Sequence, residues 1–171
     1  MKNLGSEFFD SLLAHRDRIF LICLGFTRNH ADAEELAQEV FLKALKKISS
    51  LKNRSLAKEW LFRIARNTCL DFIKRKKTIS HLQKTCPQLN EPKNNPESLI
   101  INQDLKERLT HAINSLSGKY QGVFVLKEYG DLSYQEISRT LNIKSGTVMS
   151  RLNRARQMVL KHMTGDPHEK K

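Results

Sequence analysis

The stretch from Asp131 to Val159 constrains this chain most, because its local signals specify two short helices separated by a tight turn. Ser133 is followed three residues later by Glu136, the spacing of a capping box in which each side chain accepts a hydrogen bond from the other residue's backbone N–H. An apolar stripe follows, and Asn142 tolerates the left-handed backbone conformation in which helices end. The pattern predicts a helix-turn-helix whose first helix begins at Ser133.

The second helix of this motif is predicted to begin near Ser145 or Gly146, because serine caps helix N-termini and glycine permits close backbone approach. One face of this helix is apolar, and the opposite face carries short polar and cationic groups. Between Arg139 and Lys161 there are six cations and no carboxylate. A charged helix face alone is often only solvated. Here the capping box, the turn residue and the one-sided charge coincide, which favours contact with DNA.

The segment SYQEISRTLNIKSGTVMSRLNRAR, residues 133–156, resembles the carboxy-terminal promoter-recognition region of extracytoplasmic-function sigma factors of bacterial RNA polymerase, whose signature is close to SYEEIA, GTV, SR and RAR. It departs from the family at Met149, because family members often carry Lys or Arg at this position. The departure affects which bases the helix would prefer. It also departs at Asn142, often Gly, which leaves the turn intact. The resemblance implies that the following residues bind the minus-35 duplex: Lys144, Thr147, Met149, Ser150, Arg151, Asn153, Arg154 and Arg156.

The amino half is also predicted to be helical, from apolar residues that recur at steps of three and four. One amphipathic helix is expected from Ser6 to about Phe26. A second is expected to open with Asp32 as its cap and Glu35 three residues later. A third, capped by Ser55, is expected to run through Lys77.

Acidic and amide side chains gather on the second of these helices, in an otherwise basic protein: Asp32, Glu35, Gln38 and Glu39. Complementarity to the helix dipole alone could explain them. The segment DAEELAQEVFLKAL, residues 32–45, is similar to the sigma-factor region that docks on the clamp helices of the beta-prime subunit of the polymerase. The resemblance therefore implies that these four residues contact core RNA polymerase.

A second basic surface is predicted between Arg54 and Lys77, where eight cations accompany two acids. The segment WLFRIARNTCLDFIKRKK, residues 60–77, resembles the part of sigma region 2 that opens and reads the minus-10 element. Trp60 has two interpretations, since an aromatic ring can stack on an unpaired base or simply fill a core. The resemblance implies these minus-10 residues: Leu51, Trp60, Arg63, Arg66, Asn67 and Lys74.

Residues 79–100 contain three prolines and several asparagines, which interrupt helical periodicity and predict a flexible linker. The expected fold class is all-α, with two small helical domains. Residues 1–78 would form a region 2-like domain for polymerase docking and minus-10 recognition and melting, and residues 101–171 a region 4-like helix-turn-helix domain for minus-35 recognition.

A formal net charge of +12 favours a polyanionic partner, although membrane surfaces attract cations too. No run of apolar residues is long enough to cross a membrane, so no membrane insertion and a cytoplasmic location are expected. Cys23, Cys69 and Cys86 lack the spacing of a zinc site or a disulfide framework, and the first two are interpreted as small core residues.

Catalytic motifs are missing from the sequence: it has no phosphate-binding glycine loop, and its six histidines share no ligand spacing. No enzyme, cofactor or metal site is therefore expected, and a DNA recombinase is disfavoured. A free-standing transcriptional regulator remains the alternative, with the amino half as a sensor or dimer surface. The resemblance implies instead a sigma factor that binds core RNA polymerase and promoter DNA and is controlled by an anti-sigma factor.

Overall fold

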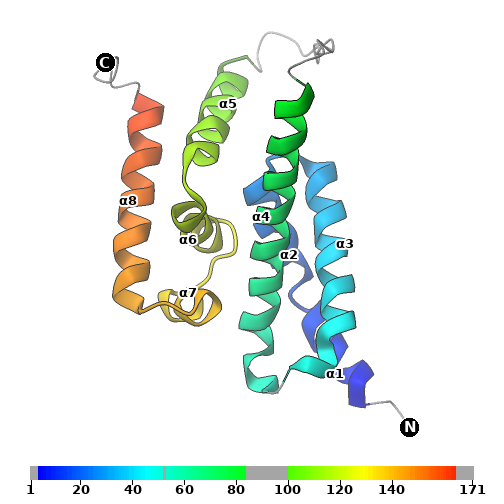
Figure 1. Cartoon of the computed structure of the whole chain (residues 1–171). Coiled ribbons are helices and arrows are strands. Elements are labelled where there is room, and N and C mark those ends of the chain that lie inside the picture. The colour runs from blue at the N-terminus through cyan, green and yellow to red at the C-terminus, as the bar shows by residue number, and fades with distance from the viewer. Residues whose placement is uncertain (1–3, 52, 84–99, 165–171) are drawn as a thin grey trace.

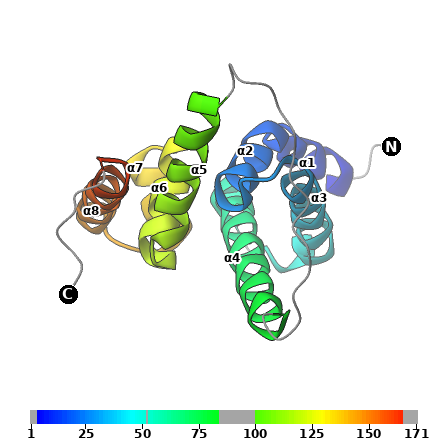
Figure 2. The ribbon, with the colours of Figure 1, turned by 90° about the horizontal axis from the view of Figure 1, so that it is seen from above.

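The computed structural model describes residues 4–51, 53–83 and 100–164, and within these ranges it contains helices and no strand. Figure 1 shows two groups of helices standing side by side, α1 to α4 and α5 to α8. The view from above in Figure 2 shows the same division. The prediction of an all-α fold made of two small helical domains is confirmed.

The amino-terminal group consists of α1 (Leu4–Leu13), α2 (Arg16–Thr27), α3 (His30–Lys47) and the long α4 (Ala57–Gln83). Two short 3-10 turns, η1 (Ile48–Ser50) and η2 (Arg54–Leu56), connect α3 to α4. Helices α2, α3 and α4 pack on one another. Their core includes Phe26, Leu36 and Phe62, whose burial contributes favourable free energy to the folding of this domain.

Three helix boundaries differ from the sequence predictions. The single helix expected from Ser6 to Phe26 is wrong, because a turn around His15 separates α1 from α2. The N-cap of α3 is Asn29, whose side chain accepts a hydrogen bond from the Asp32 backbone N–H, and so Asp32 is not the cap. Ser55 does not cap α4 either, since it lies inside η2, where Asn53 accepts from its backbone N–H.

The carboxy-terminal group consists of α5 (Ile100–Ser115), α6 (Gly118–Glu128), α7 (Tyr134–Leu141) and α8 (Ser145–Thr164). Helix α8 packs against α5, α6 and α7. Its apolar face, predicted from the sequence, is buried as expected: Val148, Leu152, Ala155 and Val159.

Cys23 and Cys69 are free and buried in the core, as predicted, with their sulfur atoms 3.6 Å apart. Helix α4 continues past residue 78 to Gln83, so the first residues of the predicted linker are helical. A frayed tail is expected from Thr164 onward, but Thr164 is the last residue of α8. The rest of that tail, the prolines of the linker and Cys86 lie outside the described residues. No helix in the described part of the chain has the length and apolar character needed to span a membrane.

Candidate nucleic-acid interface

The helix-turn-helix forms as its local signals predict. The Ser133 hydroxyl accepts from the Glu136 N–H at 3.2 Å, and the Glu136 carboxylate accepts from the Ser133 N–H at 2.7 Å. Asn142 ends α7 in the left-handed conformation, with φ of 52°. The Ile143 N–H then donates to the Ser138 carbonyl at 3.0 Å, which holds the turn before α8 begins at Ser145. Local hydrogen bonds therefore fix the angle at which α8 leaves α7.

Helix α8 lies at the outer edge of the molecule (Figure 1), and most of its polar residues are exposed. Of the eight residues predicted to bind the minus-35 duplex, six are exposed: Lys144, Met149, Ser150, Asn153, Arg154 and Arg156. Thr147 and Arg151 are half-buried. A hollow of about 480 Å³ between α7 and α8 is lined by Met149, Ser150 and Asn153, among other residues.

Two arginines of α8 are bound to neighbouring helices. The Arg156 guanidinium donates to the Glu128 carboxylate from two nitrogens, at 2.6 and 3.0 Å, and this raises the pKa of Arg156. A hydrogen bond from Arg154 lowers the pKa of the Tyr120 hydroxyl. Both guanidinium groups are thus oriented along the helix surface by side chains that sequence analysis did not identify.

The residues predicted to bind the minus-10 strand lie in two different settings. Asn67 and Lys74 are exposed on α4, whereas Trp60 and Leu51 are half-buried against the core. Trp60 therefore contributes to packing, and its stacking on a base stays a prediction. Arg66 is half-buried, and the loss of solvent around it, followed by the nearby charge of Arg151, lowers its pKa.

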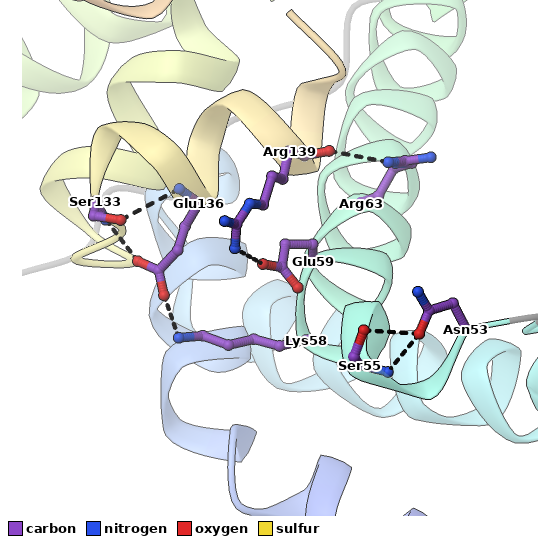
Figure 3. A network of polar contacts seen from close by, with 8 residues as sticks. All are labelled: Asn53, Ser55, Lys58, Glu59, Arg63, Ser133, Glu136 and Arg139. Carbon is purple, nitrogen blue, oxygen red and sulfur yellow. Dashed lines mark hydrogen bonds and ion pairs between the residues drawn. The ribbon is translucent and has the colours of Figure 1, made fainter. Parts of the chain in front are cut away.

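Arg63 contacts the carboxy-terminal domain directly. Its guanidinium donates to the backbone carbonyls of Thr140 at 2.9 Å and Arg139 at 3.1 Å, both in the last turn of α7. Figure 3 shows this contact within a wider polar network between α4 and α7. The sequence predicted exposed cations on α4 but gave no sign that the other domain would bind one of them.

That network contains two ion pairs that sequence analysis missed. Lys58 pairs with Glu136, the same carboxylate that completes the capping box, and Arg139 lies 3.5 Å from Glu59 (Figure 3). Desolvation raises the pKa of Glu136, but hydrogen bonds from Lys58 and Ser133 outweigh it and lower the pKa to about 2. Local sequence patterns cannot reveal contacts between residues so far apart in the chain.

The four acidic and amide residues of α3 fall into two pairs: two form ion pairs and two are exposed. Asp32 pairs with Lys76 of α4 at 2.6 Å, and Glu39 pairs with Lys43 at 2.7 Å. Glu35 and Gln38 are exposed. Ion pairs within the domain therefore explain Asp32 and Glu39 without a contact to the polymerase.

An apolar groove lies beside Gln38, between α3 and the first two helices. Its volume is about 850 Å³, and Phe41, Leu42 and Leu45 contribute to its wall. Leu42 and Leu45 are 58% and 51% exposed, although both belong to an otherwise well-packed helix. Sequence analysis missed this groove, but the signal was present, because Gln38, Leu42 and Leu45 follow one another at helical steps outside the buried stripe.

Among the described residues, no group of three or more His, Cys, Asp or Glu side chains is arranged to hold a metal ion.

Two family models match the chain: Sigma-70 region 2 over residues 12–79, and Sigma-70, region 4 over residues 106–159. The sequence is 32% identical over 165 residues to the ECF RNA polymerase sigma factor SigW of Bacillus subtilis, covering 91% of this chain and 88% of that protein.

Two solved structures share the fold at lower identity. CnrH, in complex with the cytosolic domain of CnrY, superposes with a TM-score of 0.68 at 18% identity, covering 96% of this chain and 92% of that one. The sigma factor RpoE in complex with the anti-sigma factor NepR from Bartonella quintana superposes with a TM-score of 0.63 at 24% identity, covering 94% of this chain and 98% of that one.

Proposed function

Because this chain belongs to the extracytoplasmic-function sigma factors of the sigma-70 family, we propose that it binds core RNA polymerase and directs transcription from promoters with matching minus-35 and minus-10 elements. In this role the chain supplies recognition of the promoter and the polymerase supplies the chemistry. The chain is then an initiation factor and no enzyme, and it acts in the cytoplasm with the polymerase.

The observation that carries the proposal is the outer face of α8. This helix follows a capped first helix and a tight turn, and it presents Ser150, Asn153 and Arg154 to solvent on a surface without carboxylates of its own. A helix with such short polar and cationic groups fits the major groove of duplex DNA, where they reach base edges and phosphates. We assign the minus-35 element to this face.

For the minus-10 element we assign the exposed surface of α4. Asn67 offers an amide that can bind a base edge, and Lys74 offers a charge for the backbone of a single strand. Arg63 and Arg66 lie on the same helix, in contact with the carboxy-terminal domain. Their part in strand capture requires that this contact opens.

For polymerase docking we assign the α3 surface that combines Gln38 and Glu35 with the apolar groove. An amphipathic partner helix would bury Leu42 and Leu45 and place polar groups against the amide and the carboxylate. The clamp helices of the beta-prime subunit are such a partner. The relatives of known structure were solved with an anti-sigma factor or with the cytosolic domain of CnrY, and we propose that an anti-sigma factor controls this chain as well.

A run-off transcription assay with core enzyme and a sequenced pool of promoter fragments tests the proposal. The expected result is initiation that depends on both the polymerase and this chain, at promoters that share two spaced elements. A free-standing regulator would bind duplex DNA without the polymerase and would give no initiation with core enzyme on any fragment. That result would refute the assignment.

A further inference from the structure

The two domains are held together by a shared interface, formed where α6 and α7 pack against α2 and α4. On its apolar side, Gly25 of α2 lies directly against Val125 of α6 and against Tyr129, the residue that follows α6: a Cβ atom at this position would come within 2.7 Å of both side chains. Arg28 stacks on the Tyr129 ring with its guanidinium 4.5 Å from the ring centre. The contact is therefore close-packed.

On its polar side, the interface uses the cations of α4. Lys58 pairs with Glu136, Glu59 pairs with Arg139, and Arg63 donates to the Arg139 carbonyl (Figure 3). Arg63 also donates to the neighbouring carbonyl of Thr140 in the last turn of α7. Carbonyls at a helix C-terminus lack intrahelical partners and carry the negative end of the helix dipole. They therefore satisfy Arg63 in the way that phosphate oxygens of a nucleic acid would.

The interface also contains polar groups that its formation leaves unsatisfied. In the described part of the chain, four buried side-chain atoms lack a hydrogen-bond partner: Nε and Nη2 of Arg28, Nε of Arg66 and Oγ1 of Thr140. All three residues lie where the domains meet, and burial lowers the pKa of Arg28 to about 10. A buried donor without a partner costs free energy that is regained when water reaches it. Opening the interface therefore recovers part of the free energy that these unsatisfied groups lose in the closed state.

We propose that this contact is a self-masking closed state, in which the C-terminal end of α7 competes with single-stranded DNA for Arg63, while α6 covers Arg66 beside Gly122. Separation of the domains would release both arginines for the strand. The proposal rests on the assignment of α4 to the minus-10 element. It also predicts an asymmetry, because the exposed face of α8 lies on the far side of the carboxy-terminal domain and stays free (Figure 2). Masking should weaken single-strand binding and spare duplex binding.

Two glycine substitutions form a matched pair for the test. Gly25→Ala forces a methyl group against Tyr129 and Val125 and should push the domains apart, while alanine suits the helix interior. Gly118→Ala lies at the same domain boundary, but its Cβ would meet only Leu70 at 3.7 Å, an ordinary contact. Neither glycine is among the residues assigned to DNA. Circular dichroism checks that both full-length variants keep their helix content.

The measurements are the radius of gyration by small-angle X-ray scattering and the affinity for a fluorescein-labelled, mixed-sequence single strand by anisotropy. Gly25→Ala should increase the radius of gyration and tighten single-strand binding about threefold or more, because apparent affinity scales with the fraction of open molecules. A mixed-sequence duplex should bind as it does to the wild type. Gly118→Ala should match the wild type throughout. Adding Arg63→Ala to Gly25→Ala should cancel the gain.

A second variant keeps the test independent of the glycine. Arg139→Ala removes the ion-pair partner of Glu59, a side chain that is only 7% exposed, and so disfavours the closed state. The substitution also removes a cation, which by itself weakens nucleic-acid binding. Tighter single-strand binding by Arg139→Ala would therefore have no explanation in charge and would support masking.

Three results would overturn the proposal: Gly25→Ala and Arg139→Ala bind the single strand no better than the wild type, the gain is equal for single strand and duplex, or the gain survives Arg63→Ala. The proposed function is judged separately by polymerase-dependent transcription. Initiation without any effect of these variants would remove the masking and keep the sigma factor assignment. A gain in single-strand binding without polymerase-dependent initiation would support the masking and remove the sigma factor assignment.

Discussion

The pairing of Lys58 with Glu136 gives the sharpest test of how the two domains stabilise one another. Hydrogen bonds from Lys58 and Ser133 hold the pKa of Glu136 at about 2, against an ordinary value of 4.5. The full shift corresponds to about 3 kcal/mol in favour of the folded, charged form. Because the Lys58 and Glu136 side chains remain 32% and 22% exposed, solvent screening reduces the share of the ion pair to about 1 kcal/mol.

Two substitutions separate the ion pair from the helix cap. Glu136→Gln keeps an oxygen that can accept from the Ser133 N–H, so it should cost about 1 kcal/mol in the free energy of unfolding at neutral pH. Glu136→Ala removes the cap as well and should cost about 1 kcal/mol more. In a double-mutant cycle, Lys58→Met and Glu136→Gln should show a coupling energy of about 1 kcal/mol. Urea unfolding followed by far-UV circular dichroism measures each value.

The pH dependence has a definite sign. The folded-state pKa of Glu136 is depressed, so its contribution is fully present above 4.5 and is lost as the pH falls toward 2, where the folded carboxylate is protonated as well. At about pH 3 more than half of the contribution should be gone. A coupling energy near zero at neutral pH, or one that is unchanged at about pH 3, would refute the reasoning.

The remaining predictions concern the two DNA surfaces, the docking surface and the core. Arg154→Ala should lower promoter discrimination by about 1–3 kcal/mol in competition binding if it contacts a guanine edge, and equal weakening for all sequences would make it a phosphate contact instead. Replacing Glu35 and Gln38 together should weaken binding to core polymerase, measured by pull-down, and leave duplex affinity unchanged; intact polymerase binding would contradict the docking assignment. Phe62→Ala, at a fully buried position, should lower the free energy of unfolding by about 3–5 kcal/mol, and a loss below about 1 kcal/mol in urea would contradict its place in the core.

The helix-turn-helix could be predicted closely because its determinants are local. The capping box joins residues three apart, and Asn142 ends the helix through its own backbone conformation. The helix boundaries of the amino domain were harder to predict. Asn29 and Asp32 both offer a capping pattern, and the choice of Asn29 leaves the Asp32 carboxylate free to pair with Lys76 of another helix.

The break at His15 had no sequence signal, since neither glycine nor proline lies there. In the structure the His15 ring packs 5.7 Å from the Phe62 ring, so the turn is tied to a contact with α4. The groove beside Gln38 is similar, because exposed leucines become a surface feature only when α1 and α2 are placed beside them.

The sequence by itself determined the elements whose stability rests on neighbours in the chain: the capped α7, the turn at Asn142, the amphipathic α8 and an excess of cations on α4. Only the tertiary structure decided where those cations would be neutralised. Arg63 binds carbonyls of residues 76 and 77 positions further along the chain, and Lys58 binds a carboxylate 78 positions away. The periodicity of apolar side chains indicates which face of a helix is buried, but it does not indicate which distant helix packs against that face.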